Sequence, residues 1–400
     1  MKHLLLVLLA TISLGAVSQV KDSVKVEKPS KKWSDTFTIR GYSQVRYNRL
    51  LETNKELVCE QCDRSWGDGG GFFIRRMRII FFGQISDQVY FYVQPDFASS
   101  VSSTSLNWAQ LRDAYFDVAV DKKNEFRFRI GQSKVPFGFE NLQSSQNRLP
   151  LDRNDALNSA LSNERDLGVF FYWAPEKIRK LYSSLAKEGL KTSGDYGVLG
   201  FGVFNGQTAN RPELNDNKHM VARLTYPFEI GSQVIEPGFQ AYTGQVIIPT
   251  TQLSAGAKMS ADGGYLDQRA AATLVLYPKP FGILAEYNIG RGPEFNTATD
   301  SIETRNLKGG YATISYMYKY KKHVFFPFVR IQHYEGGKKH ELDARSYRVD
   351  EMEFGLEWQP VKEFELVVMY TKSKRRFEDF KKQDNLQEGE LLRVQAQVNF

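Results

Sequence analysis

The most regular feature of this chain is the alternation of apolar and polar residues in short segments. In the final stretch LLRVQAQVNF, one parity holds Leu392, Val394, Ala396, Val398 and Phe400, and the other is mostly polar. Successive side chains of a β-strand point to opposite faces, so this segment is predicted to be a strand with one apolar and one wet face. In a soluble protein the apolar face would meet a core. In an outer-membrane barrel it would meet lipid, and the wet face would line the interior.

Similar segments recur along the chain, with turn residues between them. Several of them set arginines opposite a row of apolar residues, as in TFTIRGYSQVRYN, IRRMRIIFFG and EFRFRIG. We therefore expect an all-β chain of about sixteen strands, near residues 36–48, 72–84, 88–97, 109–119, 125–131, 167–174, 196–204, 218–227, 234–248, 266–277, 281–290, 307–320, 322–334, 346–358, 363–374 and 390–400.

Short and long connections alternate between these segments. The short ones are 85–88, 120–124, 278–280, about 321 and 359–362; the long ones are 49–71, 98–108, 132–166, 205–217, 249–265, 291–306, 335–345 and 375–389. Short periplasmic turns and long external loops are typical of an even-stranded transmembrane antiparallel β-barrel. The connection 175–195 is long where a short turn is due, and an inserted helix or hairpin would explain it.

The beginning of the chain predicts export. Lys2 precedes an apolar run over residues 4–17 that closes on small residues, which is typical of a secretory signal. We expect a signal peptide over 1–18, a short periplasmic segment over 19–35 and the barrel over 36–400. No later run of about 18 apolar residues predicts a transmembrane helix.

Composition narrows the class further. The formal charge is +7 and the basic residues are scattered, so no stripe suited to nucleic acid is present. Aromatic residues and prolines gather at the expected short turns, as in residues 226–228, 277–281 and 358–360. Aromatic rings favour the boundary between lipid and water, so we expect these turns to form part of a periplasmic girdle. A soluble β-sandwich would leave the arginine rows unexplained.

The two cysteines, Cys59 and Cys62, form one C-x-x-C pair in the first long connection. A structural zinc site needs four ligands, and no second such pair exists, so we expect no metal site. In an exported protein a small disulfide within the loop is the simpler interpretation, with free thiols as the alternative.

The segment FRFRIGQSKVPFGFE, residues 126–140, resembles the phosphate-selective porin O and P family and its R-x-G-Q-x-K-x-P-F-x-x-E signature. IRRMRI at 74–79, RDAYFDV at 112–118 and VFNGQ at 203–207 resemble further segments of that family. The signature positions are Arg129, Gly131, Gln132, Lys134, Pro136, Phe137 and Glu140. The resemblance implies a 16-stranded outer-membrane barrel, usually trimeric, whose third loop folds inward and narrows the channel. It also implies that a final strand ending in Phe400 is the signal that the outer-membrane assembly machinery recognises.

Guanidinium groups stay charged and offer forked donors, so arginines facing a lumen would favour small anions. Strand parity suggests a set of pore-lining cations, and the alternative for each is pairing with a loop carboxylate. The set is Arg40, Arg46, Arg76, Arg78, Arg127, Arg129, Lys134 and Arg223.

The loop that follows the family signature, 136–166, is expected to set the narrowest point. It carries Arg148, Arg153 and Arg165 against Glu140, Asp152, Asp155, Glu164 and Asp166, an excess of two negative charges. That is the wrong sign for a dedicated phosphate filter. We therefore expect passive diffusion of small polar solutes, with at most a mild anion preference.

Two other classes of function remain open. An envelope adhesin or binding protein without a channel would also be β-rich. An outer-membrane hydrolase would need a catalytic pair, but His219, His323, His333 and His340 lie in no recognisable nucleophile or metal motif. We expect no cofactor and no enzymatic activity.

Overall fold

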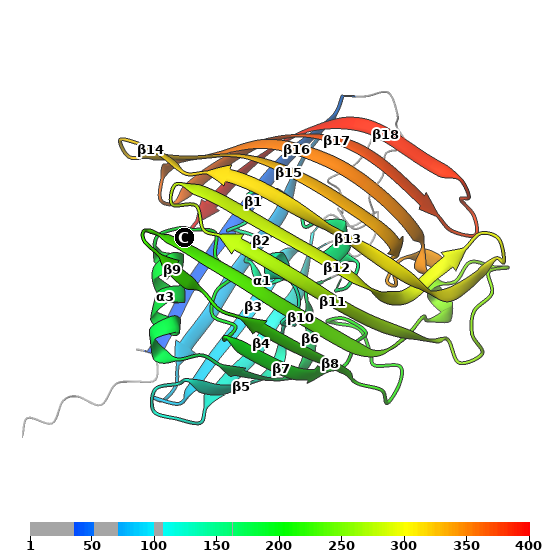
Figure 1. Cartoon of the computed structure of the whole chain (residues 1–400), viewed down its shortest axis with the longest axis horizontal. Helices are drawn as coiled ribbons and strands as arrows, with labels where there is room; N and C mark the ends of the chain where they lie inside the picture. Colours follow the sequence, from blue (N-terminus) through cyan, green and yellow to red (C-terminus); the bar gives the residue numbers. More distant parts are fainter. Residues whose placement is uncertain (1–35, 52–70, 100–106, 162) are drawn as a thin grey trace, which may run out of the picture. The chain divides into compact units, whose positions relative to one another are not determined.

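The computed structural model describes residues 36–51, 71–99, 107–161 and 163–400. Most of them belong to a single antiparallel sheet (Figure 1). Its strands are β1 Phe37–Leu50, β2 Gly71–Gln84, β3 Val89–Ser99, β4 Trp108–Ala119, β5 Phe126–Lys134, β6 Arg165–Trp173, β7 Leu199–Phe204, β8 His219–Thr225, β9 Phe228–Ile230, β10 Gln233–Ile247, β11 Gly264–Leu276, β12 Phe281–Asn296, β13 Ser301–Tyr316, β14 Tyr318–Tyr320, β15 His323–Gly337, β16 Ser346–Val361, β17 Phe364–Glu378 and β18 Asn385–Asn399.

The sheet is a closed barrel of sixteen staves, where a stave is one strand or two consecutive strands that pair with the same neighbour. Strands β8 and β9 pair with the same neighbour, β10, so they form one stave interrupted at Tyr226 and Pro227. Strands β13 and β14 both pair with β15 and likewise form one stave, interrupted at Met317. The last strand pairs with the first, from Tyr42 opposite Asn399 to Leu50 opposite Leu391. The predicted fold class and strand count are confirmed, and each expected segment corresponds to one stave.

Side-chain burial follows the predicted alternation. Along β8, buried and exposed residues alternate without a break, and the last strand does so over most of its length. The outward residues are large and apolar on many strands; examples are Ile39, Phe201, Phe239 and Ile331, each more than one-third exposed. An apolar outer surface suits lipid rather than water. The inward positions, by contrast, hold most of the buried polar side chains.

The alternation of short and long connections is also confirmed, with two adjustments. Strands β12 and β13 run further than expected, so their connection shrinks to residues 297–300 instead of 291–306. The connection 375–389 shrinks to 379–384 in the same way. In both places the added residues are mostly polar, and three of the apolar ones, Phe295, Ile302 and Phe377, are buried. Backbone pairing does not require an apolar outer face beyond the lipid.

The long connection at the short-turn end contains α3, Glu176–Lys187, which agrees with the expected inserted helix. Its residues Ile178, Tyr182 and Leu185 are buried and pack with Tyr277 and Val234. Tyr277 was expected in the aromatic girdle, but it points inward and its hydroxyl donates to Glu236 Oε2 at 2.6 Å. The described residues include no helix long and apolar enough to cross a membrane.

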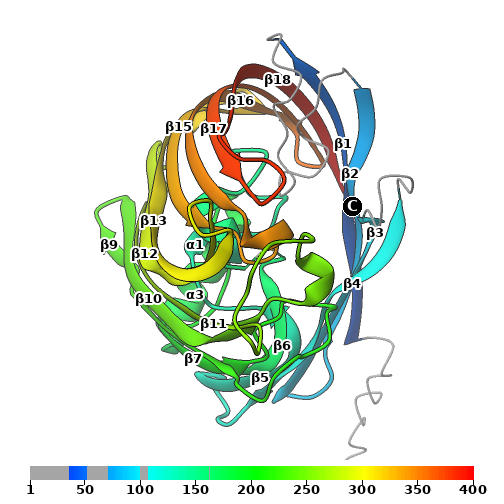
Figure 2. The same ribbon diagram turned by 90° about the vertical axis from the view of Figure 1, so that its right-hand side faces the viewer.

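The third long connection, residues 135–164, folds into the barrel as expected. Figure 2 looks at the barrel from the end with the long connections and shows α1, Phe139–Leu142, inside the ring of strands. A second short helix, α2, Asp155–Asn158, contacts β12, β13 and β15. The loop starts at β5 and reaches the opposite wall, so it crosses the interior.

Barrel closure is tight where β18 meets β1. The backbone of Phe400 exchanges two hydrogen bonds with Gly41, at 2.7 and 2.9 Å. The Phe400 ring lies over Gly41, so a Cβ added at Gly41 would lie 2.6 Å from the ring and 2.5 Å from the carbonyl oxygen of Arg78. The seam therefore requires glycine at this position.

We predict that Gly41→Val lowers the stability of the barrel by about 1–3 kcal/mol, because the backbone at Arg78 cannot move aside without breaking the ladder. The midpoint of urea unfolding, followed by tryptophan fluorescence, measures this. The matched control is Gly71→Val, since a Cβ at Gly71 would meet nothing within 4 Å. Equal midpoints for the two variants would contradict the requirement.

Candidate functional site

One carboxylate of the inward loop, Asp152, fastens it to both sides of the barrel seam. Its oxygens accept from Arg46 on β1 at 3.1 Å and from Arg393 on β18 at 2.5 Å. Arg75 lies 3.5 Å away. Burial raises the pKa of a carboxyl, but here the adjoining arginines outweigh it and hold the pKa of Asp152 well below its usual range.

Two further carboxylates continue this attachment along the same wall. Asp155 pairs with Lys338 at 2.5 Å and with Arg375 at 3.1 Å. Glu140 pairs with Arg330 at 2.9 Å. These three acidic residues of the loop are thus compensated by cations of β1, β15, β17, β18 and the 338–345 connection.

The other side of the loop is organised around Glu164. Four cations surround this carboxylate, at distances of 2.5 Å from Arg165, 3.0 Å from Arg153, 3.7 Å from Lys134 and 3.8 Å from Arg148. They hold the pKa of Glu164 well below its usual range despite its burial. Asp113 adds one more carboxylate, 2.9 Å from Arg165. One end of the loop is therefore rich in positive charge.

The facing strands β2–β4 extend this positive region. Arg78 pairs with Asp96 at 2.7 Å, and Arg112 lies 4.0 Å from the same carboxylate. Arg76 donates to the neutral amide of Gln44 at 2.8 Å. We call the following residues the cation cluster: Arg76, Arg78, Arg112, Lys134, Arg148, Arg153 and Arg165, with Asp96, Asp113 and Glu164 as its carboxylates. Seven cations thus meet three carboxylates.

Burial of the cluster is reflected in its loop residues. Desolvation lowers the pKa of Arg153 to about 10, and neighbouring Arg148 acts in the same direction, whereas Glu164 opposes it. Arg148 is buried, and its Nε and Nη1 atoms have no hydrogen-bond partner in the described residues. The described residues therefore do not fully neutralise the cluster.

Other predicted wall cations are engaged individually. Arg127 binds Asp195 at 2.7 Å, and Arg223 binds Glu236 at 3.3 Å. Arg129 makes a forked pair with Asp117 at 2.8 and 2.9 Å. Each of these three arginines thus pairs with a carboxylate, which was the alternative to an anion-contacting role. Arg40 differs, because it is exposed and its guanidinium lies 5.1 Å from the centre of the Phe82 ring.

The interior is filled unevenly. Loop residues Phe137, Leu157 and Leu161 pack against inward side chains of β6–β13, such as Tyr172 and Val221. On the short-turn side, α3 packs against the same wall. Partly exposed inward side chains remain along β1–β4, among them Arg40, Tyr90 and Tyr115. The inward side chains that keep the most exposure therefore lie along β1–β4, and we call this sector the open part of the interior.

The wall cations Arg330, Arg375 and Arg393 are central to this arrangement and were missed as site residues. They occupy the inward parity of β15, β17 and β18, the same signal that indicated the arginines of β1, β2 and β5. Arg393 was assigned to the wet face of its strand, but its partner, Asp152, is 241 residues away. Strand parity predicts the face to which a side chain points, but it does not predict the residue with which that side chain pairs.

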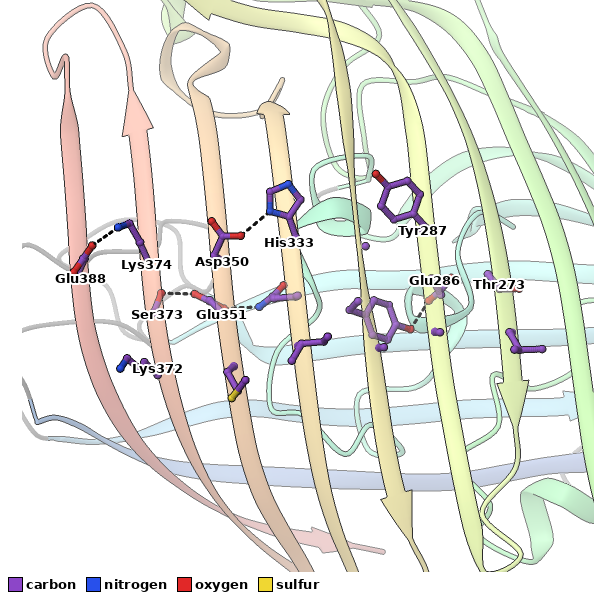
Figure 3. Close-up of a pocket in the computed structure, with 18 of the residues that line it drawn as sticks. Thr273, Glu286, Tyr287, His333, Asp350, Glu351, Lys372, Ser373, Lys374 and Glu388 are labelled. Carbon is purple, nitrogen blue, oxygen red and sulfur yellow. Dashed lines mark hydrogen bonds and ion pairs between the residues drawn. The ribbon is translucent and has the colours of Figure 1, made fainter.

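A separate hollow of about 1110 Å³ lies on the outer face of β11–β18 (Figure 3). Its floor includes Ala272, Ala285 and Ala312, which have the outward parity of their strands. Two polar pairs border it, His333 with Asp350 and Lys374 with Glu388, each at 2.7 Å. Pairing lowers the cost of charge on a lipid-facing surface. The hollow faces away from the interior and is not the route through the barrel.

Comparison with known families agrees with this geometry. The family model "Phosphate-selective porin O and P" matches residues 58–400. The chain belongs to this family. It is therefore a porin, an outer-membrane channel for small solutes, and both the family and the fold are those of a channel rather than an enzyme. No curated protein sequence matches the chain.

Solved porins share the fold at low identity. The outer membrane channel DcaP of Acinetobacter baumannii is 14% identical, with 91% of this porin and 97% of DcaP covered and a TM-score of 0.54. An anion-selective porin from Comamonas acidovorans is 11% identical, with 91% and 99% covered and a TM-score of 0.53. The trimer form of OmpT of Vibrio cholerae is 11% identical, with 91% and 99% covered and a TM-score of 0.50. These likenesses show the barrel fold alone.

Two predictions lie outside the described residues. The proposed disulfide between Cys59 and Cys62 falls in 52–70, and the signal peptide and the short periplasmic segment fall in 1–35. Both stay predictions.

The depressed pKa of Asp152 predicts how the channel responds to acid. A carboxylate whose pKa is lower in the folded state stabilises that state above its ordinary pKa of about 3.9, and this contribution disappears only as the pH falls through the lowered value. We expect the contacts of Asp152 to hold between pH 7 and about pH 4, so that the ratio of the single-channel conductances of Asp152→Asn and the wild type stays constant over this range. Planar-bilayer recordings at fixed KCl concentration test this.

Asp152→Asn should instead loosen the loop at every pH, because removing one partner of a buried ion pair costs about 3–5 kcal/mol. Larger and noisier conductance at pH 7 is the expected result. Asp384→Asn is the control, since the side chain of Asp384 is 91% exposed. A quiet, unchanged Asp152→Asn channel would show that the ion pairs do not hold the loop.

Proposed function

We propose that this porin passes small anions in preference to cations, by diffusion and without tight selection of phosphate. The observation that carries the proposal is the cation cluster, in which seven cations adjoin three carboxylates beside the open part of the interior. A charged ring or patch in a narrow pore attracts counter-ions and repels ions of its own sign.

The loop carries an excess of two negative charges, which by itself would oppose an anion preference. Pairing of loop carboxylates with wall cations reduces this effect. Asp152, Asp155 and Glu140 are compensated by wall cations on the seam side. Glu164, the loop carboxylate inside the cluster, is shared by four cations. Asp152 also acts on Arg76 and Glu140 on Arg153, so the seven cations of the cluster still outnumber the five carboxylates around them. The charge balance that a passing ion meets is therefore more positive than the balance of the loop taken alone.

The same contacts argue against a dedicated phosphate filter. A tight oxyanion site needs several donors with free hydrogen-bonding positions that converge on one point. Here Arg78, Arg165 and Lys134 already donate to protein oxygens. The remaining field is diffuse, which supports mild preference and rapid passage.

We also propose that the functional assembly is a homotrimer embedded in outer-membrane lipid, and that Phe400 serves the assembly machinery. The family and the trimeric form of one solved porin of the same fold support it. Analytical ultracentrifugation in detergent should give three chains per particle. A monomer that conducts fully would contradict the assignment.

The anion preference predicts the sign of the reversal potential in a KCl gradient. We expect an anion-selective potential that weakens as salt rises, because charges are screened over about 8–10 Å near physiological ionic strength. Arg148→Gln should shift the potential toward cations, since it removes one of the cluster's cations. Arg348→Gln is the matched control, because this exposed arginine lies on the outer face.

Three results would count against the proposal. Cation selectivity of the wild-type channel would show that carboxylates dominate the passage. An equal shift in the Arg148 and Arg348 variants would show that the cluster has no special role. Strong block of chloride current by low concentrations of inorganic phosphate would restore a phosphate-specific filter.

A further inference from the structure

A continuous belt of aromatic rings and arginines crosses the inner wall from β1 to β6. It begins with Arg40 over Phe82, continues to Tyr92 at 6.4 Å between ring centres, and reaches Tyr115, which stacks on Tyr92 at 5.1 Å and 13°. Arg129 then lies 4.0 Å from the centre of the Tyr115 ring. We call Phe82, Tyr92, Tyr115 and Tyr196 the aromatic belt.

The belt ends at Tyr196, in the segment between α3 and β7. Arg129 lies 5.3 Å from the Tyr196 ring and 5.4 Å from the Tyr172 ring, so it joins both to the tyrosines of β3 and β4. Gly131 makes room for this arrangement. Its φ is +124°, and a Cβ there would lie 2.9 Å from the Cα of Tyr115.

The belt rings lie on the inner side of the wall, in the open part of the interior. Tyr92 has the same parity as Gln94 and Asp96, and Asp96 belongs to the cation cluster. Phe82, Tyr92, Tyr115 and Tyr196 are all partly exposed, although they lie inside a barrel. Rings that only filled space between wall and loop would be buried, as Tyr172 and Phe170 are.

The belt lies next to the cation cluster, on its periplasmic side. On β2 and on β3, four residues separate the two, from Arg78 to Phe82 and from Asp96 to Tyr92. At about 3.4 Å per residue this is about 14 Å along the strand and less along the tilted barrel axis. One solute of moderate size meets the two in immediate succession.

We propose that the belt is a subsite for the ring of an acidic sugar, such as a hexose phosphate, whose acid group is attracted by the field of the neighbouring cation cluster. This proposal extends the proposed anion preference. Only the attraction of the acid group depends on that preference, and the binding of the sugar ring does not. The C–H groups of a pyranose present an apolar, weakly positive face, which packs on the negative face of an aromatic ring. Arg40 and the tyrosine side chains add polar atoms at the edges of the belt, which suits a hydroxylated ring.

Block of the KCl current by four probes tests the subsite: glucose 6-phosphate, inorganic phosphate, glucose and benzoate. We expect glucose 6-phosphate to block at a concentration at least about tenfold lower than inorganic phosphate, which is the scale of one good aromatic contact. Tyr92→Ala and Tyr115→Ala should each remove most of this difference and leave the block by inorganic phosphate unchanged. Tyr92→Phe keeps the ring and should keep the difference.

Phe91→Ala is the matched control, because Phe91 lies on the same strand with outward parity and contacts Phe37 at 4.7 Å. Equal block by glucose 6-phosphate and inorganic phosphate in the wild type would overturn the subsite. So would an unchanged difference in both alanine variants. Stronger block by benzoate than by glucose 6-phosphate would overturn the sugar assignment. A cation-selective channel in which Tyr92→Ala still weakens block by glucose would overturn the proposed anion preference and support the belt.

Discussion

The interior of this barrel depends on the ion pairs between the third long connection and the wall. Asp152 is the clearest case, because its two closest partners, Arg46 and Arg393, belong to the first and the last strand. A buried charge without a partner is costly, so the loop reaches its place only when both strands are in register. Barrel closure and loop placement are thus one event, and the tight contact of Phe400 with Gly41 reinforces the same seam.

The second constraint is apolar. Porin interiors are usually polar, but the inward positions of β6–β13 include Phe170, Tyr172 and Val221, which meet the apolar face of the loop. The helix α3 closes the same half on the periplasmic side through Tyr182 and Leu185. Two different forces therefore hold the loop: charge on the side of β1 and β15–β18, and apolar packing on the side of β6–β13. What remains open is the sector of β1–β4.

Much of this fold could be predicted because the geometry of a membrane barrel determines local features of the sequence. Each stave alternates with period two, and each connection is short or long according to its end, so strand existence, order and direction were all within reach. The family signature around Arg129 indicated the inward loop. The extended ladder of β12 and β13 was not predictable, because it carries no apolar outer row, and its apolar residues Phe295 and Ile302 are buried in a cluster whose other members lie elsewhere in the chain.

The site was harder to predict because its partners lie far apart in sequence. Arg127 and Asp195, or Glu140 and Arg330, meet only after sixteen staves have closed. Local pattern assigns such an arginine to the inner face and leaves its neutralising carboxylate unknown. The aromatic girdle shows the same limit, since Tyr277 shares a turn with outward rings and yet turns inward to Glu236.

The inward loop shows why net charge along a segment is a poor measure of selectivity. Interactions between charges fall off with distance and are screened within about 8–10 Å in salt. Asp152 is shared by Arg46 and Arg393 at the seam and also attracts Arg75 and Arg76, so only part of its charge acts on the cation cluster. Glu164 is shared among four cations and cannot neutralise them all. A loop with a negative sum can thus present a positive face, and the sign that an ion meets is decided by which carboxylates the wall has already engaged.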